Sequence, residues 1–368
     1  MRIKTESLKI ANKIWSKVRV NGIQYYEYVL LDFENKTLAF KNENTFVKVA
    51  MELEDNEDEH RAMFVSGVKF FSLVQFYPYI DLEGDTFFSP NGDKFVIPEL
   101  DEEVYFPDEE YDDWDEISVN FSADFNKQLS LSQSYIETDP SSGYSTLFFK
   151  DSDIIACNPN KMFFGKSGAT SSDFNIPVPL LRIICSLGIE GVVNFKIRKT
   201  GNSIMGEFQY LGVWIRYGSS SNFELPFDPK DEEFIASYNH PNYFVVNLSE
   251  FDGALKFLSS YLVDIPDAVC SCVFNTEDSN NMFFKIMLNY SGITEYKIKL
   301  VECSDPSFFE DKSVSIYLSS LKSAVGVLSQ YGVESIRISF DPEAPAMKFS
   351  DSKEECPVFV VHTITESI

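Results

Sequence analysis

The side chains most able to bind a metal or act as a nucleophile, cysteine and histidine, are scattered along this chain. Cys270 and Cys272 would place two thiols on one face of a strand, but a structural zinc ion needs four ligands and the histidines lie far away in sequence. The histidines are His60, His240 and His362, and the cysteines are Cys157, Cys185, Cys270, Cys272, Cys303 and Cys356. We expect no metal site, no cofactor, and reduced cysteines that act as small core residues, because no export signal is apparent.

Motifs of the common enzyme classes are missing from the sequence. It contains no glycine-rich phosphate loop, no Gly-x-Ser-x-Gly turn and no cysteine and histidine pair at a plausible spacing. Carboxylates in the acidic run 108–116 could hold Mg²⁺, but a nuclease draws such ligands from separate strands. We therefore expect no catalytic residues, which leaves charged side chains as the candidates for a binding function.

Charge is abundant and unevenly distributed. The 368 residues include 57 acidic and 31 basic side chains, for a formal net charge of −26. Acidic residues concentrate in 52–59 and 99–116, which we interpret as solvated loops, with a mimic of the DNA backbone as the alternative. The N-terminus is instead basic, with a single acid, Glu6. Its basic residues are Arg2, Lys4, Lys9, Lys13, Lys17 and Arg19.

The basic N-terminus has the pattern of an amphipathic helix over residues 6–18. Lys9, Lys13 and Lys17 share one stripe of this helix, whereas the opposite side is apolar. The apolar residues are Leu8, Ala11, Ile14, Trp15 and Val18. This pattern predicts that the apolar side packs on the protein while the lysines face solvent or an anionic partner.

Similar helices recur roughly 120 residues apart, which indicates an internal repeat. First helices are predicted over 6–18, 123–136 and 249–262, and second helices over 66–77, 178–189 and 317–331. Stretches with period-two alternation, such as 192–198 and 336–340, predict antiparallel strands between them. Because one core rarely exceeds about 250–300 residues, the length indicates two or three domains, and the repeat predicts three α+β domains, over 1–118, 119–245 and 246–368.

The predicted helices share a charge bias that the whole chain does not have. The second helices contain Lys69, Arg182 and Lys322 and no acid. The acids of the first helices are Glu6, Asp124, Glu250 and Asp252. We expect these acids in the opening turn, where they complement the helix dipole. If all six helices line one surface, that surface is neutral or basic within an acidic shell.

Three regions carry a resemblance to a known family. Residues 92–97, 102–107 and 112–114 end the first repeat with a strand, an acidic segment and an Asp-Asp-Trp run. Residues 155–162 and the Ile-Pro-Val-Pro of 176–179 lie in the second repeat, and 357–364 form an apolar terminal strand. In order and spacing they resemble the bacterial-type DNA polymerase sliding clamp, the β clamp, over nearly the whole chain.

The resemblance implies three DNA-clamp domains, each with two helices on antiparallel sheets, that assemble head to tail as a homodimeric ring. The ring would encircle duplex DNA without reading its sequence and would hold DNA polymerase and the clamp loader through short linear motifs. The basic residues expected to face DNA are Lys9, Lys13, Lys17, Lys69, Lys127, Arg182, Lys256 and Lys322. Solvent or dimer contacts are the alternative for each of them.

The resemblance also implies an apolar pocket for partner peptides between the second and third domains. Its expected residues are Leu147, Lys161, Met162, Val360, Val361, His362 and Ile364. Here the sequence departs from the family, because Pro159-Asn160-Lys161 replaces Gly-His-Arg and His362-Thr363 replaces Met-Pro. The pocket is therefore expected to accept a different peptide or to be closed, and the alternative is that these residues are strand core.

Ring closure is expected through edge strands, with Phe70, Phe71 and Phe76 as candidates or, alternatively, as core aromatics. The rival function is a clamp-like decoy or DNA-mimic inhibitor that binds host replication proteins without encircling DNA. No apolar run reaches about 18 residues, so we expect a soluble, cytoplasmic protein with no membrane span. The departures from the family pattern and the 34 phenylalanines favour a phage genome and an infected bacterial host.

Overall fold

The computed structural model of the chain divides into two compact units. It describes residues 1–19, 24–54, 61–100, 113–137, 139, 142–150, 152–166, 168–170, 172–201, 203–219, 224–225, 227–260, 268–278, 281–288, 294–310, 312–341, 343–344, 346–351 and 358–362. Unit 1 is Met1–Leu129 with Gly168–Phe223, and unit 2 is Ser130–Ser167 with Glu224–Ile368. The division passes through the expected second domain, and the bounds of the three predicted domains stay a prediction.

Unit 1 combines two antiparallel sheets with helices. Its strands are β1 (Arg2–Lys4), β2 (Tyr28–Asp32), β3 (Thr37–Lys41), β4 (Thr45–Ala50), β5 (Glu52–Glu54), β6 (Ala62–Ser66), β7 (Tyr79–Glu83), β8 (Thr86–Phe88), β9 (Lys94–Val96), β10 (Asp115–Phe121), β14 (Phe174–Pro177), β15 (Gly191–Thr200), β16 (Ser203–Tyr210) and β17 (Val213–Ser219). Its helices are α1 (Glu6–Val18), the 3₁₀ helix η1 (Gln24–Glu27), α2 (Gly67–Phe76) and α4 (Val178–Leu187), while α3 (Ala123–Ser132) contains the division between the units.

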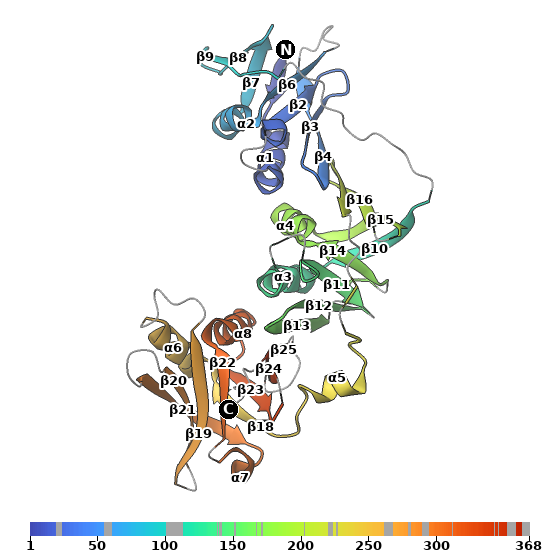
Figure 1. The fold of residues 1–368 in the computed structure, drawn as a ribbon. Helices are drawn as coiled ribbons and strands as arrows, with labels where there is room; N and C mark the ends of the chain where they lie inside the picture. Colours follow the sequence, from blue (N-terminus) through green and yellow to red (C-terminus); the bar gives the residue numbers. More distant parts are fainter. Residues whose placement is uncertain are drawn as a thin grey trace. The chain divides into compact units, whose positions relative to one another are not determined.

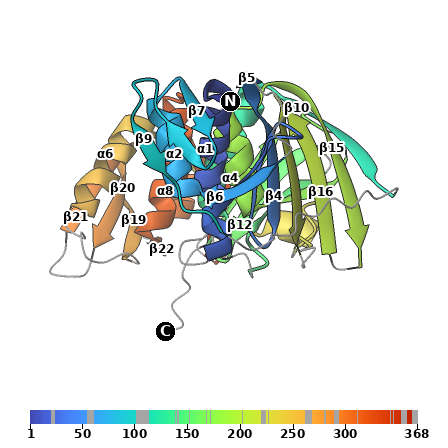
Figure 2. The same ribbon diagram turned by 90° about the horizontal axis from the view of Figure 1, so that it is seen from above.

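The larger sheet of unit 1 runs β10-β15-β16-β17-β4-β3-β2-β6 and crosses the first predicted domain boundary. The crossing is the antiparallel pair β17–β4, in which Arg216 lies opposite Phe46. Helices α1 and α4 lie on the same side of β4, β15 and β16 (Figure 2), and α1 packs against α2, α4 and β4. The smaller sheet has the order β5-β1-β7-β8-β9.

The sequence explains where these helices begin and end. In α1, Glu6 lies in the first turn and Lys17 in the last, so both charges complement the helix dipole. Helix α4 has a proline in its first turn and ends at Gly188, whose φ of 59° is the left-handed conformation that glycine adopts without steric cost. These local signals agree with the apolar stripes that hold both helices on the sheet.

Unit 2 contains the remaining elements. Its strands are β11 (Thr146–Lys150), β12 (Asp153–Asn158), β13 (Lys161–Lys166), β18 (Tyr243–Asn247), β19 (Val269–Asp278), β20 (Asn281–Leu288), β21 (Thr294–Cys303), β22 (Ser313–Tyr317), β23 (Ser335–Phe340), β24 (Ala346–Asp351) and β25 (Val358–His362). Its helices are the 3₁₀ helix η2 (Gln133–Tyr135), α5 (Glu232–Ala236), α6 (Leu248–Ser259), α7 (Pro306–Phe309) and α8 (Leu318–Gln330).

The strands of unit 2 also pair across a predicted domain boundary. Their order is β11-β12-β13-β25-β24-β23-β18-β21-β20-β19-β22. The pair β13–β25 joins the expected second and third domains and sets Met162 opposite Val360. Helices α6 and α8 pack against each other and can be followed in Figure 1.

The predicted helices are confirmed, with small changes at their ends. Helix α1 has the predicted bounds, whereas the second predicted helix ends as α3 at Ser132 and continues as η2. The third, α6, begins one residue earlier than predicted, at Leu248, because Asn247 caps it by accepting from the backbone N–H groups of Ser249 and Glu250. The prediction that Asp252 lies in the opening turn is wrong, and its carboxylate instead pairs with Lys256 one turn further on.

One close approach in the larger sheet of unit 1 requires a glycine. A Cβ at Gly206 would collide with the ring of Tyr217, which lies opposite it in the pair β16–β17. Gly218, one residue further along β17, has ordinary space, since its Cβ would come no closer than 4.0 Å to the carbonyl oxygen of Ile204. Gly206 therefore makes room for a fully buried tyrosine in the core.

Candidate functional site

Helix α1 presents the predicted stripe of lysines to the exterior. Lys9, Lys13 and Lys17 are exposed, and the opposite side of the helix is buried. The buried residues are the predicted five, Leu8, Ala11, Ile14, Trp15 and Val18. Lys9 forms an ion pair with Glu6 in the first turn, so part of its charge is already compensated.

The other candidate basic residues of unit 1 lie on three further helices. Lys69 on α2 and Arg182 on α4 are exposed, and both helices pack against α1. Lys127 on α3 is half-buried. Because α1 packs against both α2 and α4, several of the predicted cations lie on helices that contact one another.

Unit 2 repeats this arrangement with fewer charges. Lys256 on α6 and Lys322 on α8 are both exposed, and the two helices pack side by side. Lys256 pairs with Asp252 at 2.5 Å. Asn247 caps the first turn of α6, the helix that carries this lysine.

The six long helices α1–α4, α6 and α8 carry eight basic and four acidic side chains in a chain whose net charge is −26. Exposed amines on helices contact phosphates as flexible point charges and carry no sequence readout. The exposed cations on the helices of each unit can therefore hold a polyanion weakly and without regard to sequence.

The residues predicted for a peptide pocket are mostly strand core. Leu147, Met162, Val360 and Val361 are all 5% exposed or less. Met162 and Val360 belong to a buried cluster with Cys157 and Ala346, against which partly buried aromatic residues pack. These aromatic residues are Tyr144, Phe164, Phe227, Phe234 and Tyr238. The stacked rings of Phe227 and Phe234, 4.2 Å apart, come from the segment that contains α5.

Lys161 is engaged within unit 2. Its Nζ donates to Ser323 Oγ on α8 at 2.9 Å and lies 5.0 Å from the centre of the Tyr135 ring. Burial lowers the pKa of this lysine, because the charged form is desolvated. The backbone of His362 pairs in β25, and its side chain and Ile364 lie outside the described residues.

A cavity of about 280 Å³ lies next to this buried cluster, and the sequence analysis missed it. Its residues come from β11, β12, β13, β24, β25 and the segment around α5. They are Lys150, Asp153, Ile155, Phe164, Pro229, Lys230, Ile235, Tyr238, Asn239, Lys348 and Val358. The available signal was the aromatic segment 227–238, but its place in space depends on a strand pair that no local pattern predicts.

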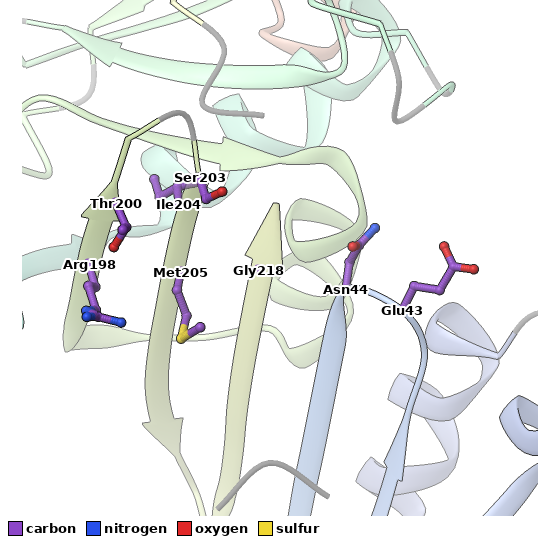
Figure 3. A pocket seen from close by; sticks show the side chains of 8 residues that line it. All are labelled: Glu43, Asn44, Arg198, Thr200, Ser203, Ile204, Met205 and Gly218. Carbon is purple, nitrogen blue, oxygen red and sulfur yellow. The ribbon is translucent and has the colours of Figure 1, made fainter. Parts of the chain in front are cut away.

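A second cavity, of about 370 Å³, lies on the larger sheet of unit 1. Figure 3 shows its side chains, which come from β15, β16, β17 and the turn before β4. They are Glu43, Asn44, Arg198, Thr200, Ser203, Ile204, Met205 and Gly218. Its cation, Arg198, is paired with Asp113 at 2.7 Å, and Glu43 adds an opposite charge, so the lining favours no particular ligand charge.

The candidate aromatics for ring closure separate into two groups. Phe70 and Phe71 are core, with 0% and 2% exposure, whereas Phe76 at the end of α2 is 76% exposed. Val96 was not among the predicted residues; it is 70% exposed on β9, which is the last strand of the smaller sheet within the described part of the chain. Exposed apolar side chains beside an unpaired strand edge are typical of an association surface.

Three of the five described cysteines are buried as predicted, whereas Cys185 and Cys303 are partly exposed. Cys157, Cys270 and Cys272 are at most 1% exposed, and burial raises the pKa of the Cys157 thiol to about 12. Cys356 and His60 lie outside the described residues. Within the described part of the chain, no group of three or more metal-binding side chains gathers, and no helix is long and apolar enough to cross a membrane.

The architecture as a whole, helices packed on antiparallel sheets that pair from repeat to repeat, defines a clamp-like α+β protein. The structure is similar to a DNA polymerase III β subunit from Eubacterium rectale, with a TM-score of 0.73, 13% identity and 100% coverage of both chains. It is also similar to the β subunit of Pseudomonas aeruginosa (TM-score 0.75, 13% identity, 99% of both chains). The sliding clamp of Bacillus subtilis matches with a TM-score of 0.72 and 14% identity, over 99% of this chain and 98% of that one.

No protein-family model matches the sequence, and no curated protein matches it significantly. At these identities the likeness establishes the fold. The chain has the fold of the bacterial β sliding clamps, which confirms the predicted fold class.

Proposed function

We propose that this protein is a DNA sliding clamp, a non-enzymatic processivity factor that encircles duplex DNA and tethers a DNA polymerase and a clamp loader. The observation that carries the proposal is the reversal of charge on the six long helices, with eight basic and four acidic side chains in a chain of net charge −26. Seven of those basic side chains are exposed and Lys127 is half-buried, so most can reach phosphates.

A sliding protein needs contacts that hold phosphates without anchoring the protein to one sequence. Phosphate contacts supply affinity and no base discrimination, and they weaken as the salt concentration rises, because the release of counterions then gains less free energy. The acidic remainder of the chain disfavours binding of DNA elsewhere. The eight cations Lys9, Lys13, Lys17, Lys69, Lys127, Arg182, Lys256 and Lys322 are the proposed contacts.

Encircling DNA requires a closed ring, for which we propose a head-to-tail homodimer. The support is the exposed side chain of Val96 on the edge strand β9 and the exposed side chain of Phe76 at the end of α2. A heterologous interface repeated around a ring closes when the rotation per copy divides a full turn. Light scattering across a dilution series should then give twice the chain mass of 42.0 kDa. The bacterial cytoplasm is the proposed location, and a phage origin stays a prediction.

The test of the function is topological. The protein is incubated with a bacterial clamp loader, ATP and nicked circular plasmid, and is followed by gel filtration before and after the plasmid is linearised. A clamp should stay on the circle and leave the linear DNA through its ends. The Lys9→Glu, Lys13→Glu and Lys17→Glu triple variant should lose retention while keeping its circular dichroism spectrum.

The matched control carries the same charge change on exposed lysines outside the long helices, Lys36→Glu, Lys199→Glu and Lys312→Glu. It should keep retention close to the parent level. If the two triple variants were retained equally on circular DNA, the helical lysines would not be part of the surface that contacts DNA. A parent protein that binds polymerase but is never retained on a circle would be a decoy instead of a clamp.

A further inference from the structure

Two of the proposed DNA-contacting lysines are held by carboxylates of their own helices. On α1, Lys9 Nζ lies 2.5 Å from Glu6 Oε2. On α6, Lys256 Nζ lies 2.5 Å from Asp252 Oδ2. The partners are three and four residues apart, a spacing that brings side chains together on one face of a helix. The two lysine side chains are 49% and 75% exposed, so both amines remain accessible to water and to an anion.

A carboxylate bonded to a side chain one turn later recurs on the first helix of each repeat. In α3, Asp124 Oδ2 accepts a hydrogen bond from Gln128 Nε2 at 2.8 Å, across four residues. The second helices α2, α4 and α8 contain no acid. No ion pair to a described residue involves the remaining exposed cations of the long helices, which are Lys13, Lys17, Lys69, Arg182 and Lys322. The helical cations are thus of two kinds, and only one kind has a carboxylate partner on its own helix.

Resting on the proposed clamp function, we propose that Glu6 and Asp252 are positioning residues that compete with DNA phosphates for the amines of Lys9 and Lys256. When a phosphate moves away, the lysine that contacted it returns to the carboxylate of its own helix. The amine therefore exchanges one anionic partner for another, and the free-energy cost of leaving each phosphate is lower than for a lysine that returns to water alone. Weaker binding and easier movement along DNA both follow, without any dependence on base sequence.

The experiment measures binding of the full-length protein to a fluorescein-labelled DNA duplex by fluorescence anisotropy at constant salt. The double variant Glu6→Gln, Asp252→Asn should bind about four times more tightly than the parent, or about twofold for each released lysine. After loading on DNA held at both ends, the double variant should also diffuse more slowly than the parent in single-molecule tracking. The same Kd and the same diffusion coefficient in parent and double variant would overturn the proposal.

A matched variant on α6 separates ion pairing from the mere loss of a negative charge. Glu250 is half-buried like Asp252, but its Oε1 accepts from the backbone N–H of Lys299 at 3.4 Å instead of from a lysine amine. Asp252→Asn should lower the Kd for the duplex about twofold, whereas Glu250→Gln should leave it nearly unchanged. Equal effects of these two variants would contradict competition for Lys256.

A double-variant cycle on α1 supplies a second control. Glu6→Gln should tighten DNA binding in the parent and have no effect in the Lys9→Gln background, because the amine for which the carboxylate competes is then missing. A full effect of Glu6→Gln without Lys9 would assign it to the general field of the carboxylate and overturn the proposal. A parent that neither binds the duplex nor stays on circular DNA would overturn the clamp function as well. A retained parent with unresponsive variants would overturn only the competition, so the two failures are distinguishable.

Discussion

The buried ion pair between Arg216 and Glu207 makes the sharpest stability prediction for unit 1. The two side chains are 10% and 12% exposed, and Arg216 Nη2 lies 2.9 Å from Glu207 Oε2. The guanidinium also lies 4.8 Å from the Trp214 ring. Arg216 sits opposite Glu207 on one side and Phe46 on the other, at the strand pair that joins the first and second predicted domains.

Replacing Arg216 by methionine keeps most of the side-chain volume and leaves Glu207 buried without its main partner. Breaking one half of a buried pair costs about 3–5 kcal/mol, and a lost cation–π contact costs about 1 kcal/mol more. Lys196 Nζ remains 3.6 Å from Glu207 Oε1 and compensates part of the charge. We therefore expect Arg216→Met to lower the free energy of unfolding by about 3 kcal/mol.

The assay is urea denaturation followed by tryptophan fluorescence. All three tryptophans of the chain, Trp15, Trp114 and Trp214, belong to unit 1, so the signal reports on the unit that contains the pair. With a denaturant slope of about 2 kcal/mol/M, the midpoint should fall by about 1.5 M. The double variant Arg216→Met, Glu207→Leu should recover to within about 1 kcal/mol of the parent, because no buried charge is left unpaired. A single variant that costs less than about 1 kcal/mol, or a double variant as unstable as the single one, would refute the reasoning.

Three further predictions follow from other contacts. Burial raises the pKa of the Cys157 thiol in the folded state from 9.0 to about 12. The contribution of the protonated thiol to the free energy of unfolding is therefore complete below pH 9 and is lost as the pH rises towards 12. Urea midpoints should fall between pH 9 and 11, and less steeply in Cys157→Val. Gly206→Ala should lower the free energy of unfolding by about 1–3 kcal/mol, because the added Cβ collides with the ring of Tyr217. Gly218→Ala should change the free energy of unfolding by less than about 1 kcal/mol. Equal thermal denaturation midpoints of the two variants would contradict this difference. The double variant Phe76→Ser, Val96→Lys should raise the dissociation constant of the dimer at least tenfold in light scattering, because a lysine on an edge strand opposes strand pairing. An unchanged dissociation constant would place the dimer interface elsewhere.

Helices were the part of the fold that the sequence predicted best. The stripe of Leu8, Ile14 and Trp15 depends only on spacing within one element, and the structure places α1 at the predicted residues. The start of α6 was missed by one residue because the cap at Asn247 was not recognised. The short helices α5 and α7 were not predicted, since four or five residues contain too little periodicity to detect.

The candidate peptide site could be predicted from the sequence only in part. The family pattern selected Met162 and Val360, and the structure buries both beneath aromatic residues of the segment around α5. The cavity beside them depends on the strand pair β13–β25 and on Tyr238, which lies far from both strands in sequence. No periodicity within one strand indicates which other strand will pair with it, because strand alternation specifies faces and not partners.

The sequence by itself determined the helices, their exposed cations and the acidity of the remaining chain, because helix periodicity and charge are properties of neighbouring residues. Only the tertiary structure decided which strands pair across the repeats, which of the phenylalanines are core and which remain exposed, and where a cavity opens beside the buried cluster. These features arise from contacts between residues that are distant along the chain, and such contacts form only when the whole sheet is assembled.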